Sequence, residues 1–185
     1  MKAKEISRIA LMIAVLSVCA QLAVPIGPVP ITLQTLGVMT LGYTLTPKQA
    51  VVATTLYMVM GLAGIPIFSG GGGSLQSFLT PSFGFIIGYI PMTYAMARIQ
   101  AKNTNNTWQG YVKGGIIGNI ILYAIGVTYM YCILNYYMNT SIGVGAALMV
   151  GMIPFIPGDI LKACVAVMIA RRVNAAFPHH VYKNN

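Results

Sequence analysis

Residues 114–158 read GGIIGNIILYAIGVTYMYCILNYYMNTSIGVGAALMVGMIPFIPG, a run of 45 residues without Asp, Glu, Lys or Arg. Two further uncharged runs, residues 9–47 and 49–97, are 39 and 49 residues long. A helix needs about 20 apolar residues to cross about 30 Å of hydrocarbon, so each run has room for up to two membrane spans. Polar and apolar residues do not alternate along the runs, as they would in a transmembrane β-barrel. The sequence therefore predicts an all-α integral membrane protein with six transmembrane helices.

The composition of the chain supports this prediction. Of the 185 residues, 57% are hydrophobic and 7% are charged, whereas an average soluble domain carries about 25% charged residues. So few charges argue against a water-soluble protein, and so many apolar residues argue against disorder. The basic residues punctuate the apolar runs instead of clustering on one surface, so we expect no nucleic-acid partner. No hydrolase or metalloprotease motif is present, and we expect neither an enzyme nor a metal site.

Proline and glycine divide the chain into a single membrane domain, residues 1–185, without a separate soluble domain. The proline-rich stretch VPIGPVP (24–30) is incompatible with a regular helix, and the glycine run 70–73 falls in a loop or re-entrant segment spanning 66–82. The predicted spans are residues 6–24, 31–45, 48–64, 83–101, 112–136 and 144–171, the last of them interrupted.

The basic residues predict how the chain is oriented. Ten of the 11 basic residues fall on the predicted tails and loops of one side, and none falls in the opposite segments 25–30, 65–82 and 137–143. Because cytoplasmic loops carry an excess of Lys and Arg, both termini are expected to be cytoplasmic, in a multi-pass protein of the plasma membrane. These inner residues are Lys2, Lys4, Arg8, Lys48, Arg98, Lys102, Lys113, Arg171, Arg172 and Lys183.

Asp159 and Lys162 are the two charged residues inside the last apolar segment. Their spacing of three places both side chains on one face of a helix. An ionised side chain at the bilayer centre costs about 2.5–3.5 kcal/mol, so a pair facing lipid is implausible. Two hypotheses follow: a structural ion pair that fixes helix packing, or a polar ligand pocket in the outer half of the bundle.

Two other groups of residues are candidates for ligand contact. Asn119 and Tyr123, four residues apart, share one helix face; an interhelical hydrogen bond and a ligand contact explain them equally well. The glycine run lacks the Gly-Lys-Ser/Thr ending of a phosphate-binding loop. It is either a flexible outer loop or, with Gln76 and Phe83 nearby, a lid over an amphipathic organic ligand.

Four stretches of the sequence are together similar to the BioY family: PVPITLQTL (28–36), GLAGIPIF (61–68) with the glycine run, GN followed by LY (118–119 and 122–123), and PFIPGDILKA (154–163). The resemblance covers residues 8–172. The chain departs from the family pattern after the glycine run, at SLQS (74–77) and TPSFGF (80–85).

Members of the BioY family are the biotin-specific S components of energy-coupling-factor (ECF) vitamin transporters. The resemblance implies a six-helix S-component fold that captures biotin at the outer face for ATP-driven uptake, biotin being the transported ligand and no cofactor being needed. The implied partners are a transmembrane coupling subunit, which docks on the Ala10 and Ala14 face of the first helix, and two ABC-type ATPases. Candidate ligand-contact residues are Asp159, Lys162, Asn119, Tyr123, Gln76, Ser82, Phe83 and Tyr89.

Biotin suits these residues chemically, in two alternative poses. Asp159 accepts hydrogen bonds from the ureido N–H groups in either pose. Lys162 or Asn119 donates to the ureido carbonyl, or Lys162 faces the valerate carboxylate instead. A different function, a stand-alone secondary transporter or a proton-coupled channel that uses Asp159 and Lys162, is the alternative, although the internal repeats and paired broken helices typical of such proteins are not evident.

Overall fold

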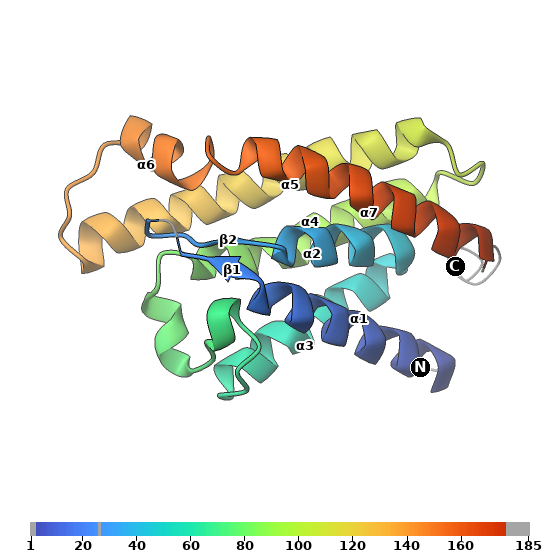
Figure 1. Ribbon diagram of the computed structural model, residues 1–185, viewed down its shortest axis with the longest axis horizontal. Coiled ribbons are helices and arrows are strands. Elements are labelled where there is room, and N and C mark those ends of the chain that lie inside the picture. Colours follow the sequence, from blue (N-terminus) through green and yellow to red (C-terminus); the bar gives the residue numbers. More distant parts are fainter. Residues whose placement is uncertain (1–2, 26, 177–185) are drawn as a thin grey trace.

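Helices that run lengthwise dominate the computed structural model, which describes residues 3–25 and 27–176 (Figure 1). The helices are α1 (Ala3–Gln21), α2 (Gln34–Thr44), α3 (Pro47–Leu62), α4 (Phe83–Ala101), α5 (Trp108–Cys132), α6 (Val144–Gly151) and α7 (Ile156–Ala176). Shorter elements are the strands β1 (Ala23–Val24) and β2 (Ile31–Thr32), the 3₁₀ helices η1 (Ser69–Gly71) and η2 (Leu75–Leu79), and the π-helical turn η3 (Ile133–Tyr137). The predicted mostly helical fold class is confirmed.

The predicted helix 31–45 is wrong at its start. Ile31 and Thr32 form β2, which pairs antiparallel with β1 through Val24↔Ile31 and Ala23↔Thr32. The hydroxyl of Thr32 then accepts a hydrogen bond from the backbone N–H of Gln34 at 3.2 Å, and α2 begins there. The prolines before Ile31 exclude a helix there. The backbone is extended instead, and pairing of the two strands gives its N–H and C=O groups hydrogen-bond partners.

The start of α3 follows from local sequence. Thr46 caps the helix: its hydroxyl accepts from the backbone N–H of Gln49 at 3.4 Å, and the Gln49 side chain accepts from the Thr46 N–H at 3.3 Å. Pro47 occupies the first turn, where its missing N–H has no intrahelical partner to lose. This reciprocal pair fixes the tight turn between α2 and α3.

Helix length does not by itself establish six spans. Among the described residues, the helix Trp108–Tyr137 is long and apolar enough to cross a membrane, and α6 with α7 meets the same criterion as a pair bent by 43°. Helix α2, with 11 residues, extends only about 16 Å at 1.5 Å per residue, less than the hydrocarbon thickness. The count of six spans therefore stays a prediction.

The α4–α5 contact is made close by glycines. A Cβ added at Gly84 would lie 2.2 Å from Cβ of Tyr129, and one at Gly126 would lie 2.4 Å from the Phe85 ring. Small residues let two helix backbones approach, which is how helices associate in lipid where no hydrophobic force drives them together. This contact holds α5 against the face of α4 that carries Gly84 and Phe85.

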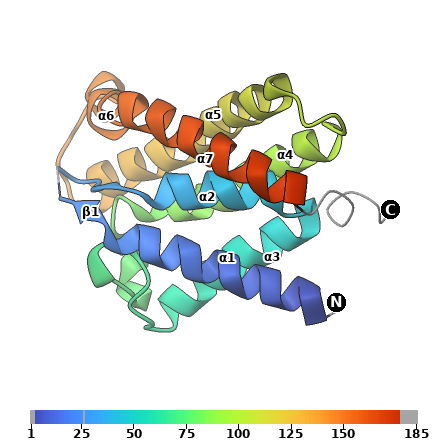
Figure 2. The same cartoon turned by 45° about the vertical axis from the view of Figure 1, so that its right-hand side comes forward.

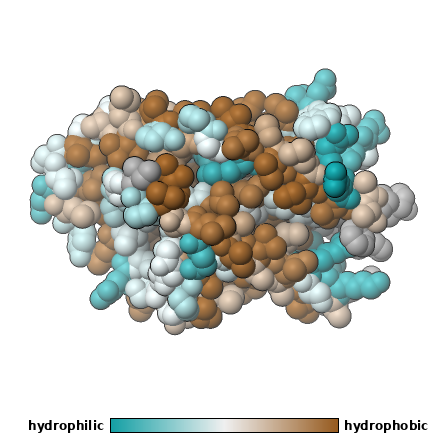
Figure 3. All heavy atoms as spheres, in the orientation of Figure 1, coloured by the Kyte–Doolittle hydropathy of each residue, from teal (hydrophilic) through white to brown (hydrophobic). Residues whose placement is uncertain are grey.

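The hydropathy of the surface residues changes along the long axis of the molecule. Hydrophobic residues cover the middle of the visible face, and hydrophilic residues gather most densely at the end that carries both termini (Figure 3). Large exposed apolar residues include Leu11 and Val18 of α1, Ile120 of α5, and Leu161 and Met168 of α7. Soluble monomers rarely expose contiguous apolar patches above a few hundred Å². This surface is that of a membrane protein.

The basic residues collect at one end of the bundle. Apart from Lys162, those in the described residues lie near the start of α1, in the α2–α3 turn, around the α4–α5 loop or near the end of α7, all at the end with the chain termini (Figure 1). Lys2 and Lys183, which complete the predicted inner set, lie outside the described residues. The distribution that the sequence predicted is thus kept in three dimensions for the described part.

Candidate functional site

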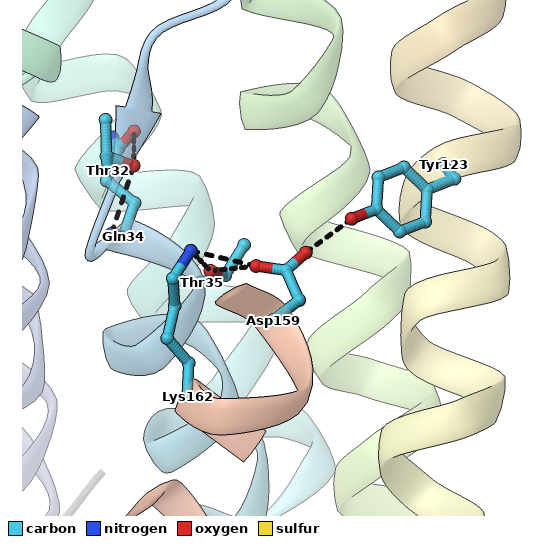
Figure 4. A network of polar contacts seen from close by, with 6 residues as sticks. All are labelled: Thr32, Gln34, Thr35, Tyr123, Asp159 and Lys162. Atoms are coloured by element: carbon cyan, nitrogen blue, oxygen red, sulfur yellow. Dashed lines mark hydrogen bonds and ion pairs between the residues drawn. The ribbon is translucent and has the colours of Figure 1, made fainter. Parts of the chain in front are cut away.

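The N-terminal turn of α7 positions the two charges of the last apolar segment. The helix begins at Ile156, directly after a break from α6, and Pro157 lies in its first turn. Asp159 follows in the same turn, where the positive end of the helix dipole favours a carboxylate. Lys162 is one turn further on and faces the same way, toward α2 (Figure 4). The predicted sharing of one helix face is therefore observed.

Asp159 and Lys162 form the centre of a polar network (Figure 4). The Lys162 Nζ lies 2.9 Å from Oδ1 of Asp159 and donates to the Thr35 hydroxyl, also at 2.9 Å. Thr35, in the first turn of α2, donates in turn to Oδ1 of Asp159 at 2.9 Å. From the opposite side, the hydroxyl of Tyr123 in α5 donates to Oδ2. Three helices thus converge on one carboxylate.

The ion pair is almost fully shielded from solvent. The side chains of Lys162 and Asp159 are 9% and 7% exposed. Removing two charges from water is costly unless further hydrogen bonds satisfy them, and Thr35 and Tyr123 supply such bonds. Of the three N–H donors of an ammonium group, Lys162 uses two within the described residues. The two paired charges cancel. Lys162 keeps one N–H donor available for a ligand.

A pocket of about 160 Å³ opens onto this network. Helices α2, α4 and α7, the β1–β2 hairpin and the loop between α3 and α4 all contribute to its wall. The hydroxyl of Tyr89 has no hydrogen bond to another described residue, so it is a further unused polar group. The pocket is lined by Val29, Pro30, Thr32, Gln34, Thr35, Phe68, Ser69, Gly72, Ser77, Thr80, Ser82, Phe85, Ile86, Tyr89, Leu122, Phe155, Asp159 and Lys162.

The loop between α3 and α4 is anchored at its first residues. The Tyr57 hydroxyl accepts from Gln34 and donates to the carbonyl of Ile67, both at 2.8 Å. The Phe68 ring is buried between Tyr57 and Phe83, and it occupies the space above Gly61, where a Cβ would come within 2.2 Å. This end of the loop is therefore part of the folded core, and the glycine run follows it.

The candidate residues predicted from the sequence divide into three groups. Asp159, Lys162, Ser82 and Tyr89 line the pocket. Tyr123 reaches the network but lies on its far side, in α5.

Three candidates neither line the pocket nor join the network, contrary to expectation. Gln76 is exposed in η2, because that short helix turns its side chain outward. Phe83 is fully buried in an aromatic cluster with Phe68, Phe78 and Tyr129.

Asn119 is the third. It donates to the carbonyl of Gly115 in its own helix, at 2.9 Å, and its buried Oδ1 has no hydrogen-bond partner among the described residues. Asn119 lines a second cavity instead.

That second cavity is a large groove between α5, α6 and α7, with a volume of about 910 Å³. Asp159 lines it as well as the pocket, so one carboxylate separates the two spaces. Most other lining side chains are aliphatic or aromatic, including Ile116, Ile120 and Val167. We call this cavity the lateral groove.

Thr35 was missed by the sequence analysis, although it lies inside the quoted stretch 28–36. A lone Thr in an apolar run has no periodic or spacing signal that distinguishes a network residue from one that bonds its own helix. The proximity of Thr35 to Asp159 and Lys162 arises only when α2 packs on α7.

The predicted docking residues Ala10 and Ala14 are both exposed. They lie on a face of α1 that flanks its buried residues, which are Ile9, Ile13, Leu16 and Ala20. This face is free in the described part of the chain, so the small residues are available to a partner helix.

Comparison with known proteins gives consistent matches over almost the whole chain. The sequence pattern of the BioY family matches residues 1–179. The chain is 36% identical over 173 residues to the probable biotin transporter BioY of Pyrococcus horikoshii, covering 94% of this chain and 98% of that one. It is 31% identical over 170 residues to the biotin transporter BioY of Thermotoga maritima, covering 92% and 95%.

A solved structure agrees with the fold. A crystal structure described as the S-component for biotin from an ECF-type ABC transporter matches with a TM-score of 0.75 and 30% identity, covering 95% of each chain. The predicted S-component fold is therefore confirmed. Since the family pattern, the sequence relatives and this fold all agree, the chain belongs to the BioY family.

Proposed function

We propose that this protein captures biotin in the pocket beside Asp159 and Lys162 and delivers it for ATP-driven uptake with an ECF energy-coupling module. The names of its relatives, which are biotin transporters, support the ligand and a role in transport rather than catalysis. The S-component for biotin that shares its fold supports the coupling module. The observation that carries the proposal is the buried ion pair that lines a small, partly polar pocket.

The polar groups left unused in the pocket match the ureido ring. That ring has two N–H donors and one carbonyl acceptor. Asp159, whose carboxylate has about four acceptor positions, accepts three hydrogen bonds from the described residues and has one position left for a ureido N–H. The third N–H of Lys162 serves the carbonyl. Phe85, Ile86 and Leu122 line the same pocket and would bury the apolar rings.

Calorimetry on the purified protein tests this assignment. Asp159→Asn and Lys162→Ala should each weaken biotin binding more than tenfold, because a hydrogen bond to a charged group is worth about 1.5–3 kcal/mol. Lys113→Ala, which removes an exposed cation of α5, is the control and should bind normally. Unchanged affinity in both pocket variants would leave the ion pair with a purely structural role.

Two biotin analogues distinguish the two poses. In 2-iminobiotin a guanidinium replaces the ureido group, so a ring that faces Lys162 would meet a like charge and bind poorly. Biotin methyl ester lacks the carboxylate charge, so it would bind poorly if Lys162 faces the valerate end instead. We favour the first result, because Thr35 and Lys162 line the narrow pocket together with Asp159.

The membrane arrangement is part of the same proposal. We infer six spans in the plasma membrane with both chain termini cytoplasmic, because the described basic residues outside the pocket gather at one end. In a variant lacking the native cysteines, Ser74→Cys should be labelled from outside intact cells, and Asn105→Cys only after permeabilisation. Labelling of position 105 from outside would show that the orientation is the reverse of the proposed one. The pocket entrance would then face the cytoplasm.

Coupling is assigned to the exposed Ala10 and Ala14 face of α1, against which a coupling subunit that works with two ATPases would pack. Ala10→Trp with Ala14→Trp should leave biotin affinity near normal but abolish ATP-driven uptake, because close packing of small residues tolerates no large side chain. Met168→Trp, on the exposed face of α7, should preserve uptake. Full uptake by the double variant would place the docking face elsewhere.

A further inference from the structure

The lateral groove runs along α5 and α7 and is closed at one end by α6. On α7 its lining residues recur at helical spacing as Ile156, Ile160, Ala163, Cys164 and Val167. Asp159 is the one charged residue of the described chain that lines it. The two long helices diverge toward the end that carries the C-terminus (Figures 1 and 2). The groove reaches the basic end of the bundle, where Trp108, Tyr111 and Val112 at the start of α5 line it.

A cation lies at that end of the groove. Arg171 follows Val167 by one helical turn, so it continues the lining stripe of α7. Its guanidinium carbon lies 4.7 Å from the ring centroid of Trp108, the first residue of α5 and itself part of the groove wall. The Nε of Arg171 is buried and has no hydrogen-bond partner among the described residues. An unsatisfied cationic donor therefore lies at the mouth of an apolar channel.

These features fit a lipid better than a small polar ligand. The lining is apolar along the groove, and its rim residues Val112, Ile116, Ile120 and Ile160 are more than half exposed. Lipid tails are as apolar as Leu, so burying a tail here gives little preference for one lipid over another. A preference has to come from the headgroup, and basic sites between helices at the cytoplasmic side bind anionic headgroups.

We propose that the lateral groove is a binding site for one anionic phospholipid, with an acyl chain along α5 and α7 and its phosphate at Arg171. Trp108 lies at the level of the headgroup, where tryptophan is enriched in membrane proteins. A second copy of this chain is the competing occupant. It would have to bring an anionic group to Arg171, but the described acidic residues are Glu5, near the start of α1, and the buried Asp159.

Competition between two lipids tests the proposal. The protein is reconstituted in vesicles of equal parts phosphatidylglycerol and phosphatidylcholine, extracted in mild detergent, and the retained lipid is quantified by mass spectrometry. Wild type should retain about fivefold more phosphatidylglycerol, the factor that corresponds to ~1 kcal/mol for one basic residue near a headgroup. Arg171→Gln should lower the ratio to about one, because the preference rests on that single charge.

Matched variants separate this site from general surface charge. Arg172→Gln removes an exposed neighbouring cation that does not continue the lining stripe, and it should keep the full ratio. Ile116→Trp, which fills the groove, should reduce the total lipid retained, whereas Ile117→Trp, on an exposed residue outside the groove, should not. Biotin binding, measured on the same samples, confirms that each variant is folded.

Three results would overturn the proposal. The first is equal retention of the two lipids by wild type. The second is the same loss of preference in Arg171→Gln and Arg172→Gln. The third is a stable dimer in light scattering that Ile116→Trp dissociates, since a second copy would then cover the groove.

Discussion

The pocket and the lateral groove share one carboxylate but differ in almost everything else. The pocket has a volume of about 160 Å³ and is lined by apolar side chains together with hydroxyls, an amide, a carboxylate and an ammonium. The groove is about 910 Å³ and nearly free of charge. Size alone would select the groove as the binding site, yet specificity for a small ligand comes from a few well-placed polar groups. The smaller cavity is therefore the one that we propose for biotin.

The difference originates on two faces of α7. Asp159 and Lys162 are buried against α2, while Ile160 and Cys164, on the neighbouring face, line the groove. Thr35 holds Asp159 from the pocket side and Tyr123 holds it from the groove side. The carboxylate thus separates the two cavities. Variants on its two sides should differ in how strongly they change the free energy of unfolding and the affinity for biotin.

The largest expected effect is on the ion pair itself. Lys162→Met leaves Asp159 as a buried carboxylate without its counter-ion, which should reduce the free energy of unfolding by about 3–5 kcal/mol. Adding Asp159→Asn should recover a large part of that loss, because no charge then remains buried. The measurement is unfolding in mixed micelles with increasing SDS. A double variant as unstable as the single one would mean that the pair contributes by packing, not by charge.

A smaller effect is expected where α5 packs tightly against α4, the helix that lines the pocket. Gly84→Ala places a methyl group against Tyr129, and overpacking of this kind should cost about 1–3 kcal/mol of unfolding free energy. Gly145→Ala, in α6 beside the groove, meets nothing within 4 Å and should be neutral or slightly stabilising. Equal destabilisation by both variants would contradict the contrast between a packed pocket wall and an open groove.

The smallest effect is expected from the groove side of the carboxylate. Tyr123→Phe removes one hydrogen bond to Asp159 without changing the ring, so the carboxylate is held less firmly. Biotin binding should weaken about fivefold, which corresponds to about 1 kcal/mol. Tyr131→Phe removes a hydroxyl that also belongs to the groove wall but has no hydrogen bond within the described chain, and it should bind biotin normally. The same affinity in both variants would show that Tyr123 does not position the carboxylate.

Much of the fold follows from one-dimensional patterns. The uncharged runs predict membrane helices, and α4 occupies the predicted range 83–101. The range 31–45 failed at its start because strand pairing between Val24 and Ile31 is a contact between segments separated by the prolines. Strands of two residues have no recognisable sequence pattern. The apolar residues at the start of the range were therefore assigned to the helix, although they form a strand.

The site was predicted where chemistry and spacing coincide. Asp159 and Lys162 could be identified because charges are rare and costly in an apolar segment, and their spacing of three fixes their relation within one helix. Asn119 was assigned from its chemistry and its spacing of four from Tyr123, and Gln76 from its place beside the glycine run. Neither argument fixes the cavity that a side chain enters, and in the structure Asn119 lines the lateral groove while Gln76 is exposed.

The sequence by itself determined that this chain is a helical membrane protein with one charged pair in its last apolar segment, and its motifs resemble those of the BioY family. Composition and short-range spacing suffice for the helical membrane class and for the charged pair, because the cost of burying charge and backbone polar groups applies residue by residue. Only the tertiary structure decided that Thr35 and Tyr123 hold Asp159 from opposite sides. Those contacts join residues 124 and 36 positions away from Asp159, and they depend on how α2, α5 and α7 pack.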